Sequence, residues 1–96
     1  MFVVTLTYKV PLAEIEAHLE EHVAFLERRF ADGTLIAAGR RVPRTGGVIL
    51  ARGDDEAALR AVLAEDPFVR FDLAEVALTA FTTTRAAEGF TGLVGL

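Results

Sequence analysis

Residues 12–30 read LAEIEAHLEEHVAFLERRF, and this stretch decides the fold. Its apolar residues recur at alternating steps of three and four, which predicts one apolar stripe along a helix. His22 falls on the next step of this stripe and lies on its flank, with Val23 on the other flank. A titratable ring at the edge of a buried face can line a cleft, but a packed histidine bonded to a backbone carbonyl gives the same pattern. The stripe consists of Leu12, Ile15, Leu19, Leu26 and Phe30.

Strand and helix patterns alternate around this helix. Residues 2–10 place apolar side chains on one face, as a strand with one buried face does. Pro11 ends this strand, and Asp32-Gly33 closes the helix because glycine accepts the left-handed conformation needed there. The other predicted elements are a hairpin of strands 34–38 and 48–52, a second helix that starts at Asp54 and buries Ala57, Leu59, Val62 and Leu63, and a last strand, 73–84.

The order strand, helix, strand, strand, helix, strand predicts an α+β fold of the ferredoxin-like βαββαβ type. Two helices would cover one face of a four-stranded antiparallel sheet and leave the other face open. The last strand carries few charges on either side, which is typical of a sheet covered on both faces. Residues 85–96 form an apolar, glycine-rich tail. We expect this tail to dock on the protein, with a neighbouring subunit as one candidate surface.

Composition limits the classes of function. A chain of 96 residues makes one domain, 1–96, and its apolar fraction of 52% exceeds what so small an interior can hide. We therefore expect a homodimer or a higher homo-oligomer. The net charge of −4 argues against a nucleic-acid partner. With no signal-peptide pattern and no apolar run near the roughly 20 residues that span a membrane, we expect a cytoplasmic protein without a membrane partner.

The residue inventory excludes several kinds of site. The chain has neither cysteine nor serine, so it lacks disulfides, Cys-based metal sites and Ser or Cys nucleophiles. His18 and His22 have the spacing of two metal ligands on one helix, but the HExxH pattern and a third ligand are missing, so we expect no metal site. The loop 39–47 matches no phosphate-binding motif. Its three arginines belong either to a solvated loop or to a site for an anionic substrate; they are Arg40, Arg41 and Arg44.

A histidine paired with a carboxylate remains as a candidate for chemistry. A neutral imidazole held by a carboxylate is a usable general base, because the anion selects the tautomer and stabilises the imidazolium that forms. Asp66 is the strongest partner for His22, since Pro67 keeps it outside the second helix, in a rigid turn. Helices that lie side by side on one sheet face can bring these two residues together.

Three motifs, taken together, resemble the YciI-like (YCII-related) family. They are the helix run HVAFL that begins at His22, the GxLxxxG strand 33–39 and the turn Asp66-Pro67-Phe68, and the likeness extends over residues 1–82. The resemblance implies a dimeric α+β barrel, in which two ferredoxin-like sheets pack face to face. It also implies a His–Asp pair in a cleft, here His22 and Asp66.

The family's known activities imply the chemistry. The resemblance points to a relative that is a dehydrochlorinase of a chlorinated hydroxymuconate, and muconolactone isomerase shares the barrel. It therefore implies a cofactor-free lyase or isomerase for a small anionic, muconate- or lactone-like substrate. In this interpretation His22 moves a proton, Asp66 orients and charge-balances it, and the substrate contacts Arg40, Arg41 and Phe68.

Two features depart from this family pattern, and one alternative function stays open. Arg40 stands where many family members have a proline, and the tail 85–96 is not explained by the motifs. The alternative is a non-catalytic ligand-binding or assembly module on the same dimeric barrel, with His22 and Asp66 joined by a structural hydrogen bond.

Overall fold

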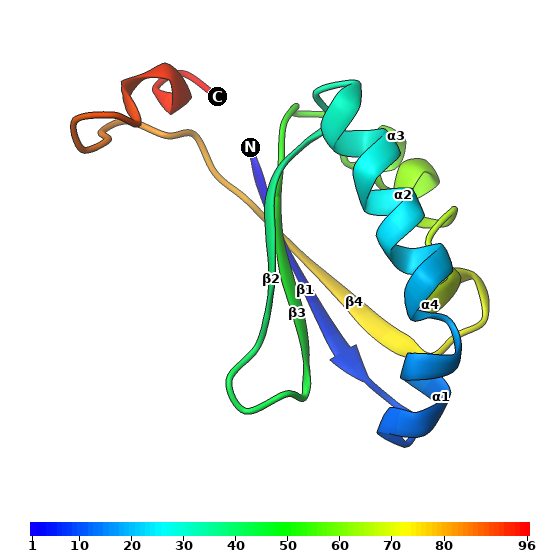
Figure 1. Ribbon diagram of the computed structural model, residues 1–96. Helices are drawn as coiled ribbons and strands as arrows, with labels where there is room; N and C mark the ends of the chain where they lie inside the picture. The colour runs from blue at the N-terminus through cyan, green and yellow to red at the C-terminus, as the bar shows by residue number, and fades with distance from the viewer.

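A four-stranded antiparallel sheet with helices on one face forms the body of the protein, as the computed structural model of residues 1–96 shows (Figure 1). The strand order is β2-β3-β1-β4. This arrangement confirms the predicted α+β, ferredoxin-like fold. The elements are β1 (Phe2–Tyr8), α1 (Leu12–Ala17), α2 (Leu19–Ala31), β2 (Leu35–Arg40), β3 (Gly46–Ala51), α3 (Glu56–Leu63), α4 (Pro67–Arg70), β4 (Ala74–Ala80) and the 3₁₀ helix η1 (Thr91–Leu93).

The core lies between the helices and the inner face of the sheet. Alternate residues of β1 point inward, and Val4 at its centre is fully buried between Ile49 of β3 and Leu78 of β4. The helices close the core from the other side with side chains such as Ile15 and Phe25. The buried cluster consists of Phe2, Val4, Leu6, Ile15, Phe25, Leu35, Ile49, Ala51, Leu59, Leu63, Phe68, Leu73 and Ala74.

The single helix predicted over residues 12–30 is wrong, because the structure divides it at His18. His18 leaves the helical conformation, with φ −112° and ψ 9°, and its ring packs against Phe71 at a centroid distance of 5.0 Å. In an unbroken helix Ile15 and Phe25 would point about 80° apart. Because of the break, α1 turns Ile15 toward the sheet and α2 turns Phe25 toward it. Both side chains are fully buried.

The predicted apolar stripe is core at only one position. Ile15 is fully buried, whereas Leu19 remains 38% exposed and Val23 42%. The buried residue of α2 is Phe25, which the predicted stripe does not contain. His22 lies on the same inward side as Phe25 and is partly buried. Leu19 and Leu26 of the stripe, with Val23 on its flank, instead line a cavity, which explains why these apolar side chains stay accessible.

Several predicted boundaries also move. The N-cap of α3 is Asp55 rather than Asp54, and its carboxylate accepts a hydrogen bond from the Ala58 N–H at 3.1 Å. The last strand ends at Ala80 instead of residue 84. Ladder pairing of β3 begins at Gly46, since glycine permits close packing against β1. Local patterns mark elements well, but their ends depend on pairing partners.

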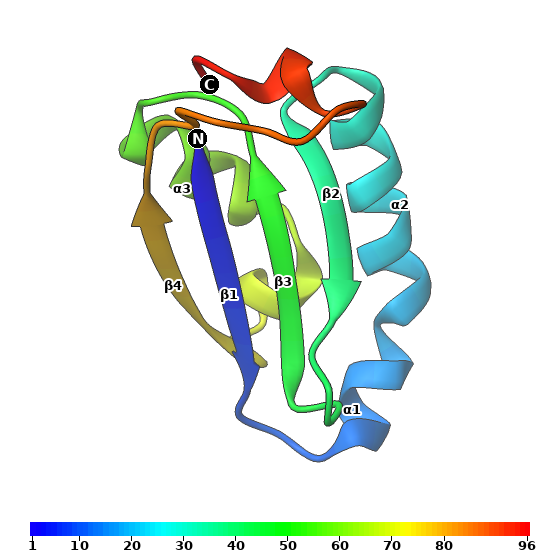
Figure 2. The same ribbon diagram turned by 90° about the vertical axis from the view of Figure 1, so that its left-hand side faces the viewer.

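No α-helix covers the outer face of the sheet (Figure 2). Val3, Val48 and Leu50 point to this side, and Val48 is 36% exposed. The tail crosses one end of the sheet and folds back on itself, with the Thr83 N–H donating to the Leu96 carbonyl at 2.8 Å. Phe90 in this tail is 63% exposed. Docking of the tail across a subunit boundary stays a prediction. No helix is long and apolar enough to cross a membrane.

The carboxyl group of Asp32, at the end of α2, predicts a pH dependence of stability that can be tested. Hydrogen bonds from Thr34, and then from Arg29, lower the pKa of the Asp32 carboxyl from 3.8 to about 2. The unfolded chain therefore binds the proton more readily than the folded one, so this contribution to stability is present above pH 3.8 and is lost as the pH falls toward 2. In urea unfolding at several pH values, Asp32→Asn should flatten this part of the stability curve. Asp54→Asn, which removes an exposed carboxylate without a hydrogen-bond partner, is the control; an equal effect of both variants would contradict the assignment.

Candidate active site

His22 of α2 and Asp66, in the turn between α3 and α4, meet on the side of the helices that faces the sheet. The distance between His22 Nδ1 and Asp66 Oδ1 is 2.9 Å. The carboxylate is fully buried, whereas the histidine side chain keeps 14% of its exposure. A carboxylate oxygen can only accept, so Nδ1 carries the proton and Nε2 is left as the acceptor. The pair therefore presents a basic ring nitrogen that solvent can reach.

A local hydrogen bond, independent of His22, holds the Asp66 side chain in place. Asp66 is the N-cap of α4, and its Oδ1 also accepts the N–H of Phe68 at 3.0 Å. Pro67 occupies the first turn of α4, where its missing N–H costs nothing. Two donors thus converge on one carboxylate oxygen, while Oδ2 is buried without a hydrogen-bond partner. The turn presents the carboxylate to His22 as a preorganised acceptor.

Aromatic contacts determine the plane of the imidazole. The Phe68 ring stacks on His22 with centroids 4.0 Å apart and planes 10° apart. Tyr8 in turn meets Phe68 edge-on at 6.0 Å. With one hydrogen bond at Nδ1 and one face covered by Phe68, the ring has little freedom to rotate. Phe68, predicted to contact the substrate, lies beside the predicted acid–base pair.

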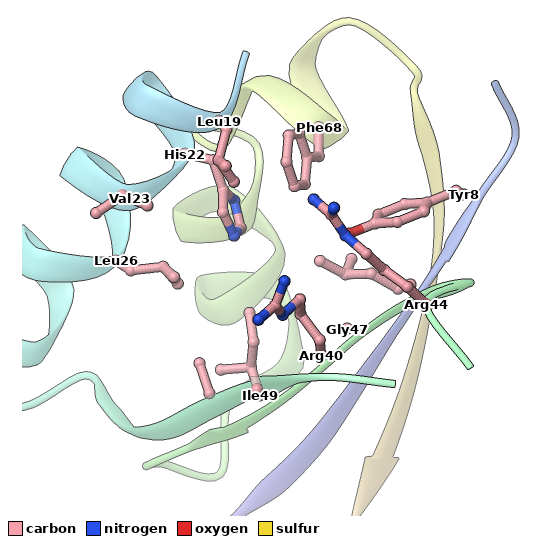
Figure 3. Close-up of a pocket in the computed structure, with 14 residues that line it drawn as sticks. Tyr8, Leu19, His22, Val23, Leu26, Arg40, Arg44, Gly47, Ile49 and Phe68 are labelled. Carbon is pink, nitrogen blue, oxygen red and sulfur yellow. The ribbon is translucent and has the colours of Figure 1, made fainter. Parts of the chain in front are cut away.

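A cavity of about 410 Å³ lies between α2 and the sheet, and the imidazole points into it (Figure 3). This volume is in the range of small-molecule sites. Apart from His22, Tyr8 and two arginines, its wall is apolar or glycine, and no carboxylate lines it. The aliphatic part of the wall consists of Leu6, Leu19, Val23, Leu26, Ala38 and Ile49.

The arginines of the β2–β3 hairpin separate into two groups. Arg40 and Arg44 line the cavity, and their guanidinium groups point toward the space in front of His22 (Figure 3). Arg41 does not line it; its Nη1 donates to Thr7 Oγ1, 3.1 Å away, on the outer face of the sheet. Neighbouring residues of a strand point to opposite faces, so Arg40 and Arg41 cannot share one site. The sequence predicted a loop for all three arginines, whereas β2 extends to Arg40, so which of them face the cavity depends on the folded path of the hairpin.

Comparison with known proteins identifies the family. The YCII-related domain matches residues 1–82. The chain belongs to the YCII-related family. Among curated proteins, none is significantly similar in sequence to this chain.

A solved structure shares the fold of this YCII-related protein. It is the 5-chloro-2-hydroxyhydroquinone dehydrochlorinase TftG from Burkholderia phenoliruptrix AC1100, in complex with 2,5-dihydroxybenzoquinone. The superposition has a TM-score of 0.70 and 16% sequence identity, and it covers 86% of this chain and 95% of the other. The name of that enzyme describes a chlorinated hydroxyhydroquinone as its substrate. At this identity the likeness concerns the fold.

The two histidines of this YCII-related chain do not form a joint site. His18 turns to Phe71, while His22 turns to Asp66. No group of three His, Cys, Asp or Glu residues lies close enough to hold a metal ion. The polar groups that converge on the cavity are therefore an imidazole, a phenol and two guanidinium groups, a set suited to moving a proton and binding an anion.

Proposed function

We propose that this protein is a cofactor-free enzyme that uses His22 and Asp66 for general acid–base catalysis on a small anionic substrate. The observation that carries the proposal is the 2.9 Å contact between a fully buried carboxylate and an imidazole that points into an open cavity. Burial of the carboxylate shields it from water, so its charge acts mainly on the imidazole. Family membership and the fold shared with a dehydrochlorinase support the same class of reaction.

The proposed step is removal of a proton from a carbon next to a carbonyl group. Nε2 of His22 takes the proton, and the electron pair of the C–H bond moves onto the carbonyl oxygen as an enolate. In an isomerisation the imidazolium returns the proton to another carbon. In an elimination the enolate expels a leaving group such as chloride, which departs with its electron pair. Asp66 stabilises the imidazolium in either case, and Arg40 offsets the charge that develops on the substrate.

The test is a search for proton transfer in deuterated buffer. The panel contains muconate-like acids, lactones and chlorinated hydroquinones, with NMR following deuterium incorporation and an electrode following chloride release. Wild-type protein should accelerate at least one of these reactions, and His18→Asn, which alters the histidine outside the cavity, should behave like wild type. Rates equal to those of buffer across the panel would count against an enzyme of this class.

A non-catalytic ligand-binding module is the second candidate, and one observation favours it. Asp66 already has a structural task as the N-cap of α4, so its contact with His22 also stabilises the turn. In this alternative the cavity binds a small molecule without transforming it. Stability and activity of matched variants distinguish the two functions, as developed in the Discussion.

We also propose that two copies pair through the outer faces of their sheets, in a protein that works in the cytoplasm. This face carries Val3, Val48 and Leu50, no α-helix covers it, and the fold resembles that of a protein of the dimeric α+β barrel type. Light scattering should then give twice the 10.4 kDa mass of one chain. Val48→Lys should shift the mass toward the monomer. Ala57→Lys should leave it unchanged, because Ala57 of α3, predicted to be buried, is exposed and lies on the helix side of the sheet. A monomeric wild type would contradict the pairing.

A further inference from the structure

Arg44, which lines the cavity, has an unsatisfied hydrogen-bond donor. Its Nη1 donates to Glu16 Oε1 at 3.2 Å, which ties the β2–β3 loop to the end of α1. Its Nε, by contrast, is buried and has no hydrogen-bond partner. A buried donor without an acceptor costs about 1–3 kcal/mol, so such a group calls for an explanation. An acceptor delivered by a ligand is the explanation that the location suggests.

The geometry of the guanidinium defines the shape of that acceptor. Glu16 engages one terminal nitrogen, so the edge formed by Nε and Nη2 is left for a ligand. Two parallel N–H groups along this edge match the two oxygens of a carboxylate, which binds them in bidentate fashion. Because the guanidinium points into the cavity, the carboxylate would lie inside it and not in bulk water (Figure 3).

The charges around the cavity favour an anion as well. Arg40, on the same side of the cavity, makes no ion pair within the chain, and no Asp or Glu side chain lines the wall. Arg44 has only the partly exposed Glu16 as a partner. An anionic group there meets two guanidinium groups, and the neighbouring carboxylates are already paired, Glu16 with Arg44 and Asp66 with His22. The opposite wall is aliphatic, with Leu19, Val23 and Leu26 from α2.

We infer that Arg44 is the carboxylate anchor of the site and that the ligand is an apolar carboxylic acid. Its carboxylate binds along the Nε–Nη2 edge of Arg44, with Arg40 as a second cation. Its apolar body lies against the aliphatic side chains of α2, which brings a carbon of the ligand in front of His22. The inference rests on the proposed function insofar as the same cavity holds the substrate, and it adds the substrate class and the residue that selects it.

Benzoate and benzamide test the inference, because they share a planar apolar ring and differ in charge. Binding is measured by calorimetry or NMR titration in wild type and in His22→Asn. Arg44→Gln should weaken benzoate binding by about 10- to 100-fold, the loss expected for a charge-assisted hydrogen bond. Arg44→Lys should weaken it as well, since it keeps the charge but lacks the two-nitrogen edge. Arg41→Gln is the matched control and should bind benzoate like wild type, because Arg41 turns to Thr7 on the other face.

The outcomes separate this inference from the proposed function. Benzoate binding that depends on Arg44 in His22→Asn supports the anchor even if no turnover is found in wild type. Equal affinity for benzoate and benzamide, or an Arg44→Gln variant that binds benzoate like wild type, overturns the anchor and leaves the acid–base proposal standing. Tighter binding of phenylphosphonate than of benzoate would also overturn it, since the selected group would then be a phosphoryl group.

Discussion

Replacement of His22 by asparagine is expected to lower kcat/KM by about 10²- to 10⁴-fold, the usual contribution of a general base, with little change in Tm. The amide nitrogen of asparagine lies close to the place of the imidazole Nδ1, so it can still donate to Asp66 Oδ1. The nitrogen that faces the cavity, Nε2, is lost. The variant therefore keeps the structural hydrogen bond and removes the proton acceptor. Steady-state kinetics on the substrate found in the screen and a thermal melt measure the two effects.

Two variants of Asp66 complete this comparison. Asp66→Asn keeps an acceptor for the Phe68 N–H but cannot balance the charge of the imidazolium, so activity should fall while most of the stability remains. Asp66→Ala removes the N-cap of α4 and leaves the Nδ1 donor of His22 unpaired, which should cost about 2 kcal/mol or more in the free energy of unfolding. If His22→Asn retained wild-type turnover, the catalytic assignment would be wrong. An inactive wild type, together with a large stability loss in His22→Ala, which removes the hydrogen bond to Asp66, would support the binding module.

Replacement of Gly46 by alanine should produce the largest loss of stability. A Cβ atom at this position would lie 1.8 Å from the carbonyl oxygen of Leu6 and 2.8 Å from its carbonyl carbon. Both atoms belong to the backbone of β1, which pairs with β3 at this point, so no side-chain rotation can relieve the overlap. We expect a loss of about 3 kcal/mol or more, at the upper end of overpacking effects. For a domain of this size that corresponds to a fall in Tm of roughly 12 °C or more.

Gly39→Ala is the matched control for this prediction. Gly39 belongs to the same hairpin and lines the same cavity, but a Cβ there would meet no atom within 4 Å. Its unfolding free energy should stay within about 0.5 kcal/mol of wild type. Calorimetry or urea unfolding of the two variants provides the comparison. Equal melting temperatures would show that β1 and β3 can separate at Gly46 without cost, contrary to the packing described here.

Residues 12–30 show which structural features hydrophobic periodicity can predict and which it cannot. The positions of apolar residues predicted a helix beside the sheet, and two helical segments, α1 and α2, together contain all of them. Periodicity could not reveal the break at His18, because the contact of its ring with Phe71 joins residues far apart in the chain. Once the break shifts the helical phase, Phe25 enters the core and Leu19 faces the cavity.

The candidate site shows a similar division. His22 and Asp66 were selected from the chemistry of their side chains and from the turn before Pro67, and the fold brings their polar atoms to 2.9 Å. Arg41 and Arg44 could not be ranked in the same way. Both are arginines of one loop, and only the path of that loop turns Arg41 outward and Arg44 into the cavity.

The sequence by itself determined the order of the four strands and the helices between them, the inward face of β1 and the turn at Asp66-Pro67, since these depend on alternation and on proline. The tertiary structure alone decided where the first helix breaks, which arginines face His22, and that Gly46 must lack a side chain. Each of these depends on contacts between atoms from distant parts of the chain. Patterns among near neighbours in the sequence cannot predict such contacts.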